Sequence, residues 1–208
     1  MHSNRLAVVA LISFALSAVT PVSAQVTDGK PFDWLPNNGV SYQCGYAKWE
    51  AIDRAIRLGV LADGTTCHFR NPSDSSPNVV FEVRLAPGGT SLDIAINLLV
   101  KRDSFDHRRI IRHPAFDTIS CADAPKLAAY IMPSVVRHQQ ISLPQPKVAS
   151  CTIESAAVDP NSMTNSPFGN RLGSGSEQPI QRRSLILSVD LADYRARLSP
   201  QLKAKGAR

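Results

Sequence analysis

Apolar residues occupy alternate positions in two neighbouring stretches of the chain. They fill every second position over residues 81–85 and, after a Pro-Gly-Gly turn, over residues 92–100. A period of two is typical of strands that bury one face, so this region predicts a β-hairpin. A helix over 91–101, opened by a capping box that begins at Thr90, is the alternative. The strict alternation and the β-branched residues favour the strand.

Apolar residues at spacings of three and four predict two amphipathic helices, over residues 45–60 and about 123–138. Ser120 or Asp123 can cap the second helix, and a proline follows in its first turn. Pro133 removes a backbone donor and should kink or end that helix.

The remaining elements are shorter. Strands are expected over 66–70, 148–158 and 184–191, followed by a terminal helix over 191–198. Residues 159–181 are rich in Asn, Ser, Gly and Pro, which predicts a long mobile loop.

The first 24 residues have the pattern of an export signal. A short basic start precedes an apolar run over residues 6–19, and Val22-Ser23-Ala24 supplies small residues at a cleavage site before Gln25. The run is shorter than the roughly 20 residues that span a bilayer, although an uncleaved anchor is the alternative. We expect the mature chain to be periplasmic or secreted, and to have no transmembrane anchor after cleavage of the signal.

Four cysteines lie beyond the signal, an even number that predicts two disulfides in an oxidising compartment. Cys44 and Cys121 each precede a predicted helix, while Cys67 and Cys151 each lie in the strand that follows it. This repeated order favours the local pairs Cys44–Cys67 and Cys121–Cys151. Free thiols or a metal site are the alternative, which the absence of any C-x-x-C pair disfavours.

These elements together predict one α+β domain over residues 25–198, with an antiparallel sheet, two packed helices and two disulfides. Residues 199–208 are expected to form a basic C-terminal tail.

Charge is distributed unevenly along the chain. The formal net charge is +6, of which Arg5 in the predicted signal contributes one; residues 25–180 hold equal numbers of acidic and basic side chains, and the remaining excess lies in residues 181–208. A neutral body with a basic end predicts a local contact with an acidic surface and argues against a nucleic-acid-binding protein. The candidate contacts there are Lys203, Lys205 and Arg208, and a simply solvated tail is the alternative.

Residues 103–117, DSFDHRRIIRHPAFD, concentrate reactive side chains. His107 and His113 are six positions apart, which points them in different directions on a helix and separates them by about 20 Å on a strand. We therefore expect no metal site in this segment, and we expect the protein to have no cofactor. Three arginines could contact an anion or a partner: Arg108, Arg109 and Arg112. A salt-bridged connecting segment is the alternative.

No catalytic or nucleotide-binding signature is present. We therefore favour an exported, non-catalytic envelope protein that binds a partner, such as an accessory component of a conjugal-transfer or secretion apparatus. The alternative is a small secreted hydrolase whose site is assembled from scattered residues, with Asp103, His107 and Glu82 as the first candidates. The sequence does not predict an oligomeric state.

Overall fold

The computed structural model describes residues 34–35, 41–42, 44–60, 65–70, 78–103, 105–136, 142–159, 161, 165–172 and 179–206. All of them belong to one compact unit, residues 33–208. The predicted signal peptide, residues 1–24, lies outside the described residues.

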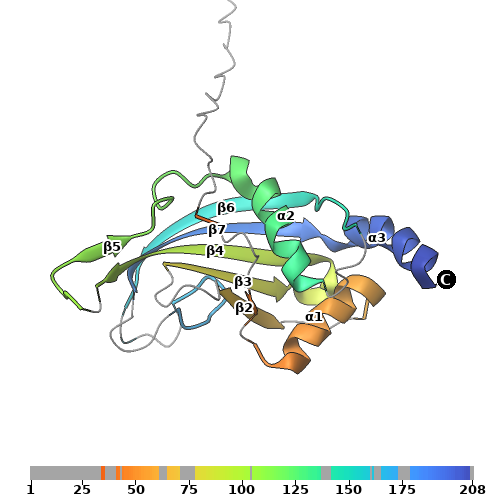
Figure 1. Ribbon diagram of the computed structural model, residues 1–208, viewed down its shortest axis with the longest axis horizontal. Coiled ribbons are helices and arrows are strands. Elements are labelled where there is room, and N and C mark those ends of the chain that lie inside the picture. The colour runs from red at the N-terminus through yellow and green to blue at the C-terminus, as the bar shows by residue number, and fades with distance from the viewer. Residues whose placement is uncertain are drawn as a thin grey trace, which may run out of the picture. The chain divides into compact units, whose positions relative to one another are not determined.

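The chain folds into an antiparallel sheet with helices packed on it, which confirms the predicted α+β class (Figure 1). The strand order is β1-β2-β3-β4-β7-β6, and β5 pairs with β4 beyond the end of β3. The strands of the described part are β1 (Ser41–Tyr42), β2 (Thr66–Arg70), β3 (Val79–Leu85), β4 (Ser91–Arg102), β5 (Ile110–Arg112), β6 (Val148–Ala157) and β7 (Pro179–Asp190).

Both predicted amphipathic helices form, and a third ends the chain. Their bounds are α1 (Tyr46–Leu58), α2 (Ala124–Val135) and α3 (Leu191–Gly206). Short 3₁₀ turns, η1 (Pro87–Gly89) and η2 (Cys121–Asp123), precede β4 and α2. Helices α1 and α2 lie over the same face of the sheet, and α3 packs against α1 (Figure 1).

The alternating pattern of the hairpin faces those helices. Phe81 lies opposite Ile96 in the β3–β4 register, and Ile96 lies opposite Leu185 on β7. The ring of Phe81 reaches Tyr130 of α2, with 6.1 Å between the ring centroids. The strand prediction is therefore confirmed, and a helix over 91–101 is excluded.

The second face of the sheet is also covered, whereas the sequence predicted one buried face. Leu172 packs against Val80 of β3 and Leu99 of β4, and all three side chains are buried. Residues 165–172 thus lie on the sheet face that points away from α1 and α2. They belong to the predicted mobile loop, and the last residues of that loop, 179–181, are already part of β7.

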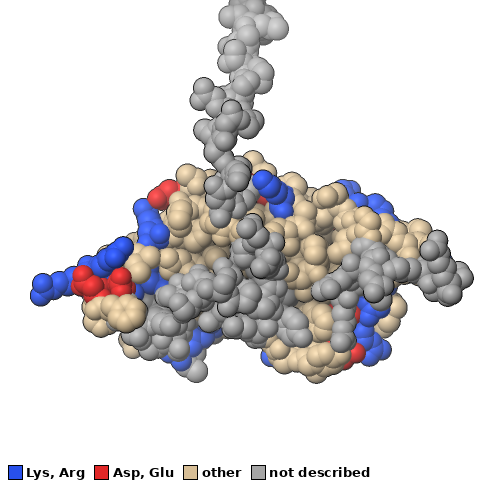
Figure 2. Space-filling model, viewed as in Figure 1, with Lys and Arg blue, Asp and Glu red and all other residues tan. Residues whose placement is uncertain are grey.

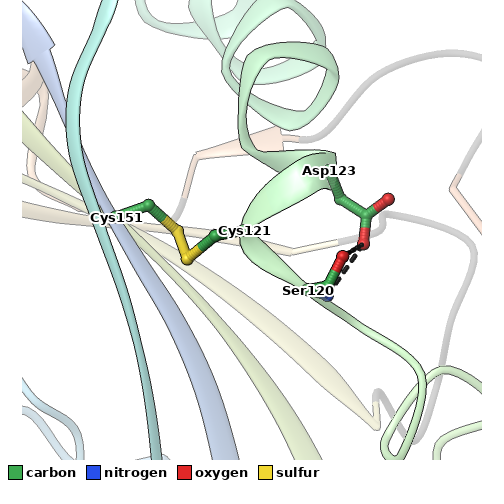
Figure 3. Close-up of a disulfide and its surroundings, with 4 residues drawn as sticks. All are labelled: Ser120, Cys121, Asp123 and Cys151. Carbon is green, nitrogen blue, oxygen red and sulfur yellow. Dashed lines mark hydrogen bonds between the residues drawn. A yellow bond between two sulfur atoms is a disulfide. The ribbon is translucent and has the colours of Figure 1, made fainter. Parts of the chain in front are cut away.

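Both predicted disulfides are present, Cys44–Cys67 and Cys121–Cys151. Figure 3 shows the second, which joins η2, the turn that leads directly into α2, to β6 beside a capping box in which Ser120 donates to the Asp123 carboxylate. The box confirms the predicted beginning of this helix. Two disulfides are consistent with a secreted or periplasmic protein.

The terminal helix is longer than predicted. It ends at Gly206 instead of Leu198, and it includes Pro200. Residues 199–206 of the predicted tail are therefore helical, while residue 208 lies outside the described residues. No helix in the described part of the chain combines the length and the apolar character needed to cross a membrane.

Candidate functional site

The three candidate catalytic residues do not share a site. Glu82 lies in the middle of β3, opposite Ala95 of β4, whereas Asp103 follows the far end of β4. Asp103 follows Ala95 by eight positions along the strand, which corresponds to roughly 27 Å. His107 lies in the same turn as Asp103, so the geometry gives no support to a catalytic group made of all three.

Glu82 is instead the centre of a buried polar network. Its Oε2 accepts a hydrogen bond of 2.6 Å from Asn97 Nδ2, and its Oε1 accepts one of 2.7 Å from Asn170 Nδ2. Asn97 also donates to the carbonyl of Val80 at 3.2 Å. Glu82 lies on the sheet face that points away from the helices, and its side chain is fully buried because residues 165–172 lie over it.

The network continues onto the neighbouring strands. Ser184 Oγ donates to Asn97 Oδ1 at 2.6 Å and accepts from Arg182 Nη1. Arg182 forms an ion pair with Glu154 of β6 at 3.6 Å. Burial lowers the pKa of the Arg182 guanidinium, and the charges of Glu154 and Glu82 act in the opposite direction.

The hydrogen bonds of this network join neighbouring strands to one another and to residue 170, which is a structural role. A nucleophilic serine needs a base to take its proton, yet the Ser184 hydroxyl donates to an amide oxygen. Both Glu82 oxygens already accept hydrogen bonds from side-chain amides, which are neutral. Within the described ranges, no three His, Cys, Asp or Glu side chains are grouped so that they could hold a metal ion.

The exposed candidate is the hairpin formed by β4 and β5, whose described turn residues are 103 and 105–109. Asp103 Oδ1 accepts backbone hydrogen bonds from Phe105 at 2.9 Å and Asp106 at 3.3 Å. These bonds, the first above all, hold the pKa of the Asp103 carboxyl below its ordinary value of 3.8. The Phe105 side chain is 98% exposed, and Ile110 beside the turn is 55% exposed.

Three arginines belong to the same hairpin, and they differ in whether they form ion pairs. Arg112 bonds Asp117 at 2.8 Å and stacks over Phe116, and Arg109 lies 3.9 Å from Asp103. Arg108 is exposed and forms no ion pair with any described residue. Figure 2 shows acidic and basic side chains together at this end of the molecule.

The sequence alone did not predict which residues of the β4–β5 hairpin are exposed. Phe105 was not among the predicted contacts, and its only signal is a lone aromatic residue in the polar stretch Asp-Ser-Phe-Asp. On β5, Ile111 is half-buried, whereas Ile110 is exposed.

The basic C-terminal residues lie elsewhere. Helix α3 begins beside Thr90, at the start of β4, whereas the hairpin extends from the other end of that strand. Lys203 is exposed on α3, the side chain of Lys205 is outside the described part, and so is Arg208. The predicted arginine and lysine contacts therefore do not form one surface.

The two histidines of residues 103–117 also lie in different environments. His113 is buried and packs edge-on against Trp34, with 4.8 Å between the ring centroids. Its Nδ1 accepts a hydrogen bond from the backbone of Ala115. His107 is exposed in the turn.

Comparison of this chain with protein families, with curated proteins and with solved structures finds no match.

Proposed function

We propose that this chain is an exported, non-catalytic protein of the cell envelope that binds a protein partner through the tip of the β4–β5 hairpin. The observation that carries the proposal is the phenylalanine at the tip, Phe105, with 98% of its side chain exposed. Leaving a large aromatic ring in water is unfavourable, and aromatic residues with nearby arginines are frequent energetic centres of protein interfaces.

The backbone of the turn is prepared for binding. The hydrogen bonds that Asp103 accepts from Phe105 and Asp106 fix the chain on either side of the ring, so less conformational entropy is lost on association. The complementary surface would be an apolar pocket for Phe105 with an acidic rim for Arg108 and Arg109.

An accessory component of a conjugal-transfer or secretion apparatus is the kind of protein that we propose. The predicted export signal and the two disulfides support a location outside the cytoplasm. A hydrolase is not proposed, since Glu82 lies in the middle of the sheet, far from the turn that holds Asp103 and His107.

Site-specific photo-crosslinking in the source cell tests this proposal. A photoreactive phenylalanine analogue at position 105 should give one cross-linked protein, and the same analogue at exposed position 192 of α3 should not. Arg108→Glu with Arg109→Glu should abolish the cross-link, whereas Lys203→Glu tests whether α3 contributes. Identical cross-linking from positions 105 and 192, or full cross-linking by the arginine variant, would contradict the proposed surface.

A further inference from the structure

Strand β6 forms one edge of the sheet over ten residues. It pairs with β7, and no other strand of the described part lies along its second side. The opposite edge of the sheet is β1, a strand of only two residues. Short edge strands limit pairing with other chains, and β6 lacks that protection.

The backbone groups of β6 that do not pair with another described residue can be assigned. Val158 donates its backbone N–H to the carbonyl of Ile180, which makes residues 158 and 180 a hydrogen-bonded pair. Hydrogen-bonded and non-hydrogen-bonded pairs alternate along an antiparallel ladder. The N–H and C=O groups of Cys151, Ile153 and Ser155 therefore point away from β7, to the open side of the strand.

The side chains of β6 do not prevent another strand from pairing there. The sequence VASCTIESAA contains no lysine, arginine or proline, the residues that commonly protect an edge. Its single charge, Glu154, is paired with Arg182 on β7 of the same chain. The only irregularity is a register shift between Val148 and Ser150, at the beginning of the strand.

We propose that β6 pairs with β6 of a second copy, antiparallel and in register about Ile153, to give a two-fold symmetric dimer with one continuous sheet. A two-fold axis at Ile153 places residues on the helix-covered face opposite residues of the same face. The hydrogen-bonded pairs are then Ile153 with Ile153 and, twice, Cys151 with Ser155.

The side-chain pairs across the interface favour this register, and they favour a second copy of the chain as the partner. It places two apolar Ile153 side chains opposite each other and Thr152 opposite Glu154, so no like charges meet. An axis at Glu154 would oppose two carboxylates, and an axis at Thr152 would extend the pairing into the bulge before Ser150. A symmetric interface uses the same patch on both copies, and β6 matches itself in sequence and charge.

The mature, disulfide-bonded protein tests this dimer by sedimentation velocity over a concentration series. The parent should shift from monomer to dimer as concentration rises. Ser155→Pro should remain monomeric, since it removes an outward N–H and leaves the β7 ladder intact, whereas Ser155→Ala should dimerise as the parent does. Circular dichroism checks that both variants are folded.

Amide hydrogen exchange gives a second readout that needs no substitution. The amides of residues 151, 153 and 155 should gain protection with concentration, while those of 152, 154 and 156 should be protected throughout. A parent that stays monomeric at millimolar concentration would overturn the proposal. So would a dimer that survives Ser155→Pro, or uniform exchange along β6.

Discussion

The carboxylate of Glu82 accepts a hydrogen bond of 2.7 Å from Asn170, a residue 88 positions later in the chain. The bond joins the middle of β3 to the segment that covers the second face of the sheet. Phe168 of the same segment lies under the Arg84 guanidinium, 4.3 Å from it. Polar and apolar contacts together therefore hold residues 165–172 against the strands.

Asn170→Ala should lower the free energy of unfolding by about 2 kcal/mol, since a hydrogen bond to a charged group is lost beside a buried carboxylate. Urea denaturation measures the change. Asn161→Ala is the matched control, because residue 161 is exposed, and its stability should stay close to that of the parent. Equal stability of the two variants would show that the Glu82–Asn170 bond contributes little.

The Cys121–Cys151 disulfide closes a loop with a sequence separation of 30. Replacing both cysteines by alanine should cost about 3–4 kcal/mol in the chain-entropy model. Urea denaturation should show this loss in the variant, and reductant should then destabilise it less than it destabilises the parent. An unchanged unfolding midpoint would contradict the prediction.

Tyr194 on α3 is fully buried, and its hydroxyl has no hydrogen-bond partner among the described residues. Tyr194→Phe should therefore raise the free energy of unfolding by about 1 kcal/mol at neutral pH. Lower stability of the variant would indicate that the hydroxyl is satisfied in solution.

Burial also raises the pKa of Tyr194 from 10.0 to about 12. The folded protein then keeps the proton that the unfolded chain releases, so the stability is fully present below pH 10 and is lost as pH rises through about 12. Alkaline denaturation followed by circular dichroism should show a smaller loss in Tyr194→Phe. Tyr130, whose pKa burial raises to about 12 as well, should account for part of the remaining loss.

Asp103 should titrate below 3.8, because its carboxylate accepts the backbone hydrogen bonds of the hairpin turn. A group with a lowered pKa stabilises the fold above its unfolded pKa, and that contribution disappears as pH falls through the folded pKa. NMR should show the amide protons of Phe105 and Asp106 shifting with the Asp103 midpoint.

The same amide shifts should be absent in Asp103→Asn, which keeps an acceptor but cannot titrate. A midpoint at or above 3.8 in the parent would mean that the turn is not held by this side chain.

Local patterns in the sequence were sufficient for much of the fold. The alternation through Phe81 and Leu92 gave the hairpin, and the position of each cysteine relative to a helix gave both disulfides. These features depend on neighbours in the chain, so spacing reveals them. A local pattern also ended the last helix too early, because Pro200 is accommodated within α3.

Long-range contacts were beyond such reasoning. Nothing near Glu82 in the sequence indicates that Asn170 will cover it, and a loop rich in turn residues gave no sign of the buried Leu172. The exposure of Phe105 was equally hidden, since an aromatic residue is ordinarily expected in a core.

The position of β7 has a consequence for the order in which the chain can fold. Although β7 is the last strand in the described part of the chain, it lies between β4 and β6. Until residues 179–190 have left the ribosome or a translocation channel, β6 has no neighbour and the sheet stays divided. The topology therefore delays closure of the sheet until residues 179–190 are available.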